Sequence, residues 1–243
     1  MACSFKSPLT GIYGESYSGG SFAPELKKAG FDAVVIEGKA DRPTYLWLSH
    51  GDVEFREVRS LWGLDTYETQ DSIRRDLGDN KVKVACIGPA GENLVKFGCI
   101  CNDYWRQAGR CGAGAVMGSK NLKAIAVRGT QTITVAHPDE LGKFVREFMR
   151  KIREDPALGT AYPKYGTPNS VNMTNLAGVF RTRYWSKGQF EKYEEIDAEA
   201  LREKILISSK ACLGCPIACG KLTQVKNGPY KGAIVEGSEY ETI

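Results

Sequence analysis

Three cysteines lie within eight residues near the carboxyl end of the chain, and they restrict the fold of this region more than any other feature. They are Cys212, Cys215 and Cys219 of the segment K-A-C-L-G-C-P-I-A-C-G, residues 210–220. Spacings of two and then three intervening residues bring the thiolates to one side of a tight turn, as an iron–sulfur cubane or a zinc ion requires. The iron–sulfur interpretation is favoured. Zinc, and three buried thiols without a metal, stay open as alternatives.

The whole chain contains 8 cysteines, many for an intracellular protein. In a reducing compartment, clustered cysteines indicate a metal site rather than disulfides. No apolar run approaches the ~20 residues that span a bilayer, and the start M-A-C-S-F-K-S-P lacks the apolar stretch of a signal peptide. We therefore expect a cytoplasmic location and no membrane contact. A fourth metal ligand would come from one of the other cysteines or from a residue outside the chain.

Composition excludes several classes of protein. A chain of 243 residues with 42% hydrophobic and 26% charged residues is typical of a globular protein rather than a disordered or fibrous one. The net charge of +4 comes from interleaved charges of both signs. This balance is too mild to indicate nucleic-acid binding.

The pattern of short apolar runs predicts an α+β protein with two parts, a β-sheet-rich domain at 1–130 and the start of an α-helical domain at 131–243. Turn signals separate β-branched and aromatic runs in the first part. Strands are predicted at 31–37, 44–49, 53–58, 82–87, 94–101 and 122–127. Helices are predicted at 22–29, closed by Gly30, and at 67–77, closed by Gly78.

Helical periodicity replaces the strand pattern after His137. A single apolar stripe predicts a helix that begins at Pro138 and ends before Pro156. Residues 156–195 are irregular and are expected to form ordered loop and short helix. Asp197 is expected to cap a further helix that runs to about Leu206 and leads to the cysteines.

A second constellation, R-Q-A-G-R-C-G-A-G-A-V-M-G-S-K at residues 106–120, combines arginines with four glycines. Glycines let backbone N–H groups approach a ligand, and the forked donors of Arg106 and Arg110 suit phosphate. The segment matches neither a Walker A loop nor a dinucleotide fingerprint. Two interpretations stay open, a loop for a phosphate-bearing ligand and a tight turn at a domain edge.

Two further segments carry weaker signals. In Y-S-G-G-S-F, residues 17–22, Gly19 and Gly20 precede a predicted helix, whose free amides could accept an anion, although a structural role is favoured. The acidic segment E-G-S-E-Y-E, residues 236–241, could supply a general acid or base beside a metal cofactor. On local grounds a solvated surface is favoured for it. His50 and His137 are expected to be surface residues.

Taken together, these segments resemble the aldehyde:ferredoxin oxidoreductase family of tungsten- or molybdenum-containing bis-pterin enzymes. The resemblance runs from end to end in family order. It rests on K-S-P-L-T-G at 6–11, E-L-K-K-A-G-F-D-A-V-V-I-E-G-K-A at 25–40, I-G-P-A-G-E-N-L-V-K-F at 87–97, the segment 106–127, P-K-Y-G-T at 163–167, the cysteine motif and E-G-S-E-Y-E.

The resemblance implies an N-terminal β-sheet domain that forms a base for the pterin cofactor, followed by helical domains. It implies that Cys212, Cys215 and Cys219 are three of the four ligands of a [4Fe–4S] cluster. Contacts to a pterin phosphate are implied for Tyr17, Gly19, Arg106, Gln107, Gly109 and Arg110. Glu241 matches a family glutamate beside the substrate that assists proton transfer.

By the same resemblance, the expected function is oxidation of an aldehyde to a carboxylic acid at a tungsto- or molybdo-bis-pterin centre. Electrons would pass through the cluster to ferredoxin, and the full-length protein would be compatible with a homodimer. Family enzymes are more than twice as long, and their fourth cluster cysteine falls beyond the end of this chain. We therefore expect a fragment that is inactive alone.

Two alternatives to this function remain. The same scaffold could act on another substrate, by reducing an aryl-CoA thioester or a carboxylic acid. The chain could also be a non-enzymatic, cysteine-rich metal-binding module that holds a partner interface.

Overall fold

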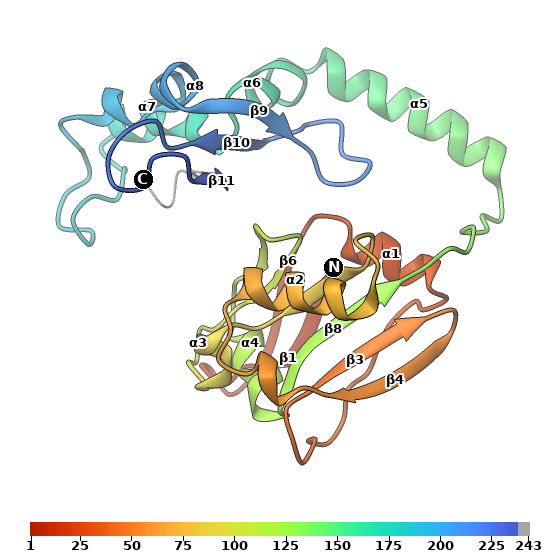
Figure 1. Cartoon of the computed structure of the whole chain (residues 1–243). Helices are drawn as coiled ribbons and strands as arrows, with labels where there is room; N and C mark the ends of the chain where they lie inside the picture. Colours follow the sequence, from red (N-terminus) through yellow and green to blue (C-terminus); the bar gives the residue numbers. More distant parts are fainter. Residues whose placement is uncertain (238–243) are drawn as a thin grey trace. The chain divides into compact units, whose positions relative to one another are not determined.

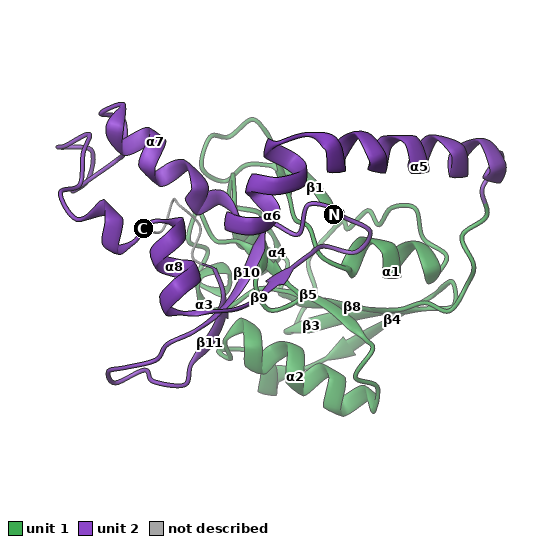
Figure 2. Cartoon of the chain, turned by 90° about the horizontal axis from the view of Figure 1, so that it is seen from above, with its two compact units in different colours: residues 1–134 green, residues 135–243 purple. Residues whose placement is uncertain are grey.

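The structure is a computed structural model that describes residues 1–237. The chain divides into two compact units, unit 1 at Met1–Thr134 and unit 2 at Val135–Ile243 (Figure 2). Both units combine helices and strands, so the predicted mixed α and β class is confirmed. No helix among the described residues is long and apolar enough to cross a membrane.

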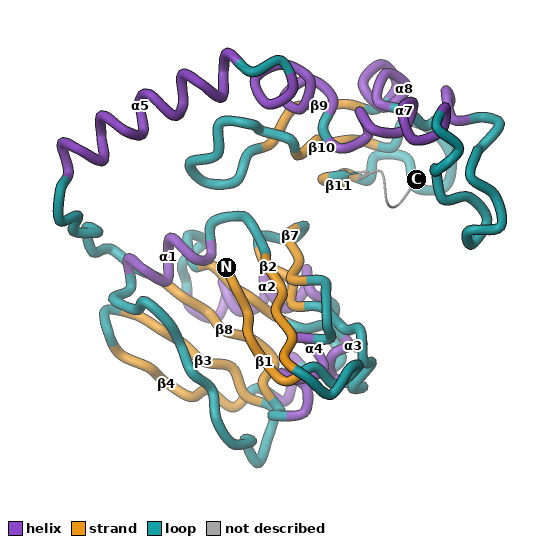
Figure 3. The backbone as a smooth tube through the Cα atoms, turned by 180° about the vertical axis from the view of Figure 1, so that it is seen from behind, coloured by secondary structure: helices purple, strands orange, loops and turns teal. Residues whose placement is uncertain are grey.

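Unit 1 is built on a six-stranded sheet with the order β4-β3-β8-β5-β6-β7 (Figure 1). Its strands are β3 Thr44–Ser49, β4 Asp52–Glu57, β5 Lys83–Cys86, β6 Ile100–Asn102, β7 Arg106–Ala108 and β8 Leu122–Arg128. The β3–β8 pair is parallel, and the other neighbours are antiparallel. A separate antiparallel hairpin joins β1 Ala2–Lys6 to β2 Tyr13–Tyr17 (Figure 3).

Two helices cover opposite faces of this sheet (Figure 2). Successive residues of a strand point to opposite faces, so in β5 Ala85 packs in the cluster with Phe22 of α1 Phe22–Lys28, whereas Val84 packs with Ile73 of α2 Thr66–Leu77. Burial of apolar side chains on both faces stabilises the unit. Unit 1 also contains short helices at Arg59–Leu61, α3 Pro89–Glu92 and α4 Ala113–Ser119.

Helix α2 shows why local sequence predicts these elements well. The Asp65 side chain accepts hydrogen bonds from the N–H groups of Tyr67 and Glu68. The Glu68 carboxylate in turn accepts a hydrogen bond from the Asp65 N–H, which completes a capping box. At the other end Gly78 has a φ of 65°, which glycine adopts without strain. The predicted helix and its end are confirmed.

Two predicted strands of unit 1 are wrong. Residues 31–37 belong to no helix or strand, and Phe31, Val34 and Ile36 pack against the α1 side of the core without a neighbouring strand. Of the predicted strand 94–101, only the end belongs to β6. The rest follows α3 in turns, with Leu94 at a φ of 58°.

Unit 2 begins with the predicted helix, α5 Pro138–Glu154. Short helices follow at Ala157–Ala161, α6 Tyr162–Tyr165, Thr167–Asn169, α7 Ser170–Leu176, Tyr193–Glu195 and α8 Ala198–Lys204. Asp197 caps α8 as predicted, because its side chain accepts a hydrogen bond from the Ala200 N–H.

The described part of unit 2 also contains an antiparallel sheet that the sequence did not indicate. Its order is β11-β10-β9, with β9 Leu206–Lys210, β10 Gly220–Gln224 and β11 Ile234–Glu236. Lys210 pairs with Gly220 in the register of β9 and β10. The cysteine motif is therefore the loop of a β-hairpin.

Candidate functional site

In unit 1 the structure brings together two segments that the sequence analysis selected separately. The Arg110 N–H donates to the Ser16 hydroxyl at 2.9 Å, and Asn102 Nδ2 donates to the Gly19 carbonyl oxygen at 3.0 Å. The buried Ser18 hydroxyl donates to Asn102 Oδ1 at 2.5 Å. The segment after β2 and the segment around β7 thus form one continuous surface, which we call the arginine–glycine face and define as residues 16–19 and 106–110.

A tight turn between β6 and β7 fixes the start of this face. Asp103 and Tyr104 both have positive φ, 48° and 63°. The Asp103 carboxylate accepts hydrogen bonds from the backbone N–H and the hydroxyl of Ser21, at 2.5 and 2.6 Å. On the other side, the Tyr104 N–H donates to the amide oxygen of the buried Gln70 at 3.2 Å. Sequence reasoning missed these residues, although the Asn-Asp pair before Arg106 is a turn signal.

Loss of the Asp103 carboxylate is expected to weaken this turn. We expect Asp103→Ala to lower the free energy of unfolding by about 1–3 kcal/mol, because two donors of Ser21 lose their acceptor. Urea denaturation of the full chain measures the change. Asp41→Ala, at an exposed position, is the control and should stay within ~0.5 kcal/mol. Equal stability of the two variants would contradict the role of Asp103.

The arginine–glycine face offers hydrogen-bond donors to solvent. Gln107, Gly109 and Arg110 are exposed and Arg106 is half-buried, whereas Ala108 between them is buried. Tyr17 is 64% exposed, and a hydrogen bond to Glu15 raises the pKa of its hydroxyl, which therefore stays protonated. Guanidinium groups form paired hydrogen bonds with phosphate oxygens. The face therefore has the donor set for a phosphate-bearing ligand.

The glycines of residues 106–120 have two different roles, which corrects the view that all four let a ligand approach. A Cβ atom on Gly112, Gly114 or Gly118 would collide with a backbone carbonyl oxygen of another segment, that of Lys96, Cys99 or Gly91, respectively. These three glycines permit close packing of α4 inside unit 1. Only Gly109 of the four has no atom within 4 Å of an added Cβ.

Paired alanine substitutions separate these roles. Gly118→Ala is expected to lower the free energy of unfolding by about 1–3 kcal/mol, because the new methyl group overpacks the contact with Gly91. Gly109→Ala is expected to change it by less than ~0.5 kcal/mol, since the space around it is open. Urea denaturation of both variants checks the difference. Stability losses of equal size would show that the packing argument is wrong.

The half-buried Trp105, next to Arg106 in the chain, has a buried indole nitrogen. Among the described residues, Trp105 Nε1 is the buried side-chain polar atom that has no hydrogen-bond partner within the protein. Buried donors are nearly always satisfied, by protein, water or ligand. A ligand bound beside Arg106 would be one source of the missing acceptor.

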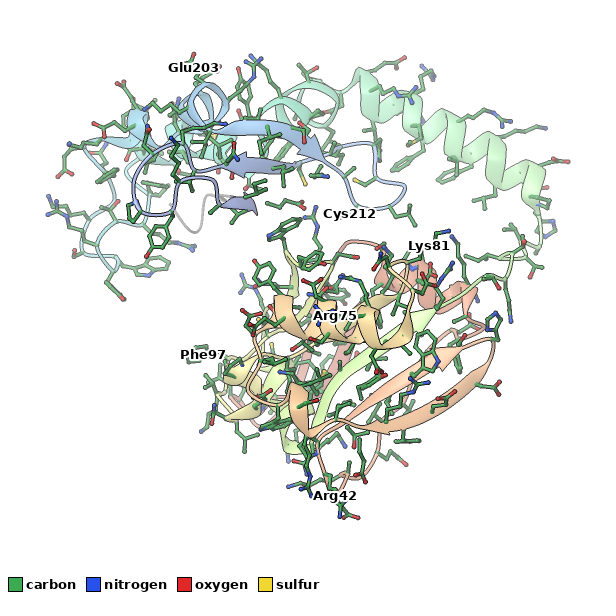
Figure 4. The ribbon with its side chains drawn as sticks, in the orientation of Figure 1. Arg42, Arg75, Lys81, Phe97, Glu203 and Cys212 are labelled. Carbon is green, nitrogen blue, oxygen red and sulfur yellow. The ribbon has the colours of Figure 1, made fainter. Side chains whose placement is uncertain are left out.

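In unit 2 the three cysteines occupy the loop between β9 and β10 (Figure 4). The Cys215 N–H donates to the Cys212 carbonyl oxygen at 3.0 Å, and Gly214 and Ala218 have positive φ, so the chain wraps tightly. All three thiols are half-buried. Within residues 1–237, no three His, Cys, Asp or Glu side chains form a group that could hold one metal ion. In a cubane each thiolate binds a different iron, and soft thiolates are the ligands that such clusters use.

Lys221 follows the loop that carries the three cysteines, residues 211–219, which we call the thiol loop, and its side chain holds this loop in place. The sequence did not indicate this role. It is 2% exposed, and its ammonium donates to the Pro163 and Ala218 carbonyl oxygens at 2.9 and 3.0 Å. A buried ammonium needs such acceptors. The loop is therefore joined to the strand that follows it and to the chain at α6. The remaining predicted site residue, Glu241, lies outside the described residues.

Comparisons with known proteins cover nearly the whole chain. Residues 1–129 match the family model "Aldehyde ferredoxin oxidoreductase, N-terminal domain", and residues 143–243 match "Aldehyde ferredoxin oxidoreductase, domains 2 & 3". The tungsten-containing aldehyde ferredoxin oxidoreductase of Pyrococcus furiosus is 46% identical over 238 residues. That match covers 98% of this chain and 39% of the relative, so the chain spans about two fifths of the relative's length.

Two other relatives have different names. The WOR-like subunit of the aliphatic sulfonate oxidoreductase of Pyrococcus furiosus is 31% identical over 252 residues, covering 97% of this chain and 39% of that protein. A solved structure, the active-site complex BamBC of benzoyl coenzyme A reductase with 1,5-dienoyl-CoA, matches with a TM-score of 0.76 and 31% identity. It covers 96% of this chain and 37% of the matched chain.

Proposed function

This chain belongs to the aldehyde ferredoxin oxidoreductase family, and we propose that it forms the part of a longer tungsten or molybdenum oxidoreductase that binds the pterin phosphates and three corners of an iron–sulfur cluster. The observation that carries the proposal is the arginine–glycine face, in which two distant segments join through Ser16, Gly19, Asn102 and Arg110. The identity of 46% to a tungsten-containing enzyme supports it.

The residues of each site have separate tasks. Cys212, Cys215 and Cys219 would hold three irons of a [4Fe–4S] cluster. Contacts to the pterin phosphates come from Tyr17, Gly19, Arg106, Gln107, Gly109 and Arg110. When bound, the bis-pterin metal supplies oxygen transfer and two-electron redox chemistry. The protein contributes charge neutralisation by the guanidinium groups and a fixed orientation.

The proposed reaction is oxidation of an aldehyde to a carboxylic acid, with ferredoxin as the electron acceptor. Glu241 moves a proton at its carboxylate. A second candidate is reduction of an aryl-CoA thioester, which the similarity to the BamBC complex favours. Assays of the longer protein with an aliphatic aldehyde, an aromatic aldehyde and benzoyl-CoA distinguish the two. Turnover of benzoyl-CoA without turnover of either aldehyde would replace the first proposal by the second.

Removal of the proposed proton-transfer group is expected to slow turnover. In the longer protein, Glu241→Gln should lower kcat at least ~10²-fold, because a positioned general acid or base contributes about that much. Metal and iron contents should not change. Glu203→Gln on the exposed surface of α8 is the control (Figure 4). An unchanged kcat in Glu241→Gln would remove this residue from the mechanism.

A further inference from the structure

Three thiols of unit 1 lie in or just before strands β5 and β6, where Cys101 pairs with Gln107 of the arginine–glycine face. Cys86 of β5 lies directly opposite Cys101 of β6 in the strand register. Cys99 lies just before β6 and precedes Cys101 by two residues. The sulfur atoms of Cys99 and Cys101 are 3.6 Å apart. This distance is that of a hydrogen bond between two thiols.

The three thiols differ in access to solvent. Cys86 is fully buried and Cys101 is 4% exposed, whereas Cys99 is half-buried. The Cys86 thiol also donates to the Thr66 carbonyl oxygen at 3.6 Å. Phe97, just before this segment, is 73% exposed at the edge of unit 1 (Figure 4). Cys99 is therefore the thiol that a small reagent reaches first.

The same geometry makes the three thiols chemically unequal. The hydrogen bond from Cys101 lowers the pKa of Cys99 to about 7 and correspondingly raises the pKa of Cys101. Burial raises the pKa of Cys86 to about 12. A thiolate is the reactive form of cysteine. An accessible thiolate beside a second thiol is the arrangement of cysteines that undergo reversible oxidation.

We propose that Cys99 and Cys101 form a reversible disulfide when the protein meets a hydroperoxide. The Cys99 thiolate attacks the peroxide, the O–O bond breaks, and a sulfenic acid forms while the leaving oxygen takes a proton from water. Cys101 then attacks the Cys99 sulfur, an S–S bond forms, and the hydroxyl leaves as water with the Cys101 proton. Two thiols lose two electrons, and the hydroperoxide is reduced to water or an alcohol.

The covalent geometry makes this disulfide easy to reduce. Cys99 and Cys101 are two residues apart in the chain. In an extended chain, this spacing separates the two Cα atoms by about 6.5–7 Å. That separation lies at the upper end of the range that a disulfide spans, so the bond forms with strain. Strained disulfides have higher reduction potentials and exchange readily with dithiols. The oxidation is therefore a reversible modification of unit 1.

Peptide mapping of the full chain tests the proposal. The reduced protein is treated with equimolar hydrogen peroxide, blocked with N-ethylmaleimide, and cleaved with trypsin. Peptide 97–106 then contains Cys99 and Cys101, and peptide 84–96 contains Cys86. We expect peptide 97–106 to lose two hydrogens and carry no label, and dithiothreitol added before blocking to restore double labelling. Two labelled thiols in this peptide after peroxide, or a link from Cys101 to peptide 84–96, would overturn the proposal.

Three variants assign the roles. In Cys101→Ser, oxidation should stop at a Cys99 sulfenic acid, which a cyclic 1,3-dione traps. Cys99→Ser should slow oxidation of peptide 97–106 at least ~10-fold, because the reactive thiolate is gone. Cys86→Ala is the matched control and should form the Cys99–Cys101 disulfide normally. If a variant fails to fold, the mapping of the unaltered chain still decides the question. Oxidation of Cys101 at an unchanged rate in Cys99→Ser would contradict the assigned order.

Discussion

Replacing Lys123 by methionine is expected to lower the free energy of unfolding of unit 1 by about 3–5 kcal/mol. The Lys123 and Glu92 side chains form an ion pair with exposures of 0% and 3%. Lys123 Nζ also donates to the Leu64 carbonyl oxygen at 2.8 Å, and Glu92 accepts from the Gly63 N–H at 2.8 Å. Without the ammonium, a buried carboxylate lacks its counter-charge, which is a large penalty in a low-dielectric interior.

A double-mutant cycle tests the origin of this loss. Lys123→Met combined with Glu92→Leu removes both charges, and it should recover most of the stability that Lys123→Met loses. Urea denaturation of the full chain measures all variants. If the double variant is destabilised by the sum of the two single changes, the ion-pair explanation is wrong.

Replacing Cys215 by serine is expected to remove most of the iron from the longer protein. Cys215 is the middle thiol of the loop between β9 and β10, and serine is a poor ligand for iron in a cluster that thiolates hold. Iron per chain should fall at least ~10-fold, with loss of the visible absorbance of the cluster. Elemental analysis after anaerobic purification gives the result.

Leu213→Ala is the matched control for this change. Leu213 lies in the same loop and is 61% exposed, so its truncation alters the loop without removing a ligand. We expect normal iron content in this variant. Equal loss of iron from both variants would indicate that Cys215→Ser loses iron because the loop misfolds, not because a ligand is missing.

Local signals predicted much of the fold. Asp65, Glu68 and Gly78 define the two ends of α2, and the short apolar runs of β3 and β8 were found at nearly correct bounds. The run at 31–37 was misassigned because Phe31, Val34 and Ile36 are partly buried against the core without any strand beside them, while Val35 is exposed. Burial alone produces this alternation, and strand pairing depends on distant residues that local sequence does not identify.

The site shows the same limit. The residues of the arginine–glycine face were selected from motifs, but the bonds that join its halves connect residues more than eighty positions apart, such as Gly19 with Asn102. Periodicity does not reveal such contacts. The glycines were misassigned for a similar reason, because the collision that excludes a side chain at Gly118 involves Gly91 of another helix. The buried Lys123 in the largely apolar strand β8 was also not anticipated.

Elemental analysis of the anaerobically purified longer protein, for iron, zinc, tungsten and molybdenum together, tests the central proposal most directly. The proposed roles of the thiol loop and the arginine–glycine face predict iron in the same sample as tungsten or molybdenum. Zinc without iron, tungsten or molybdenum would contradict them.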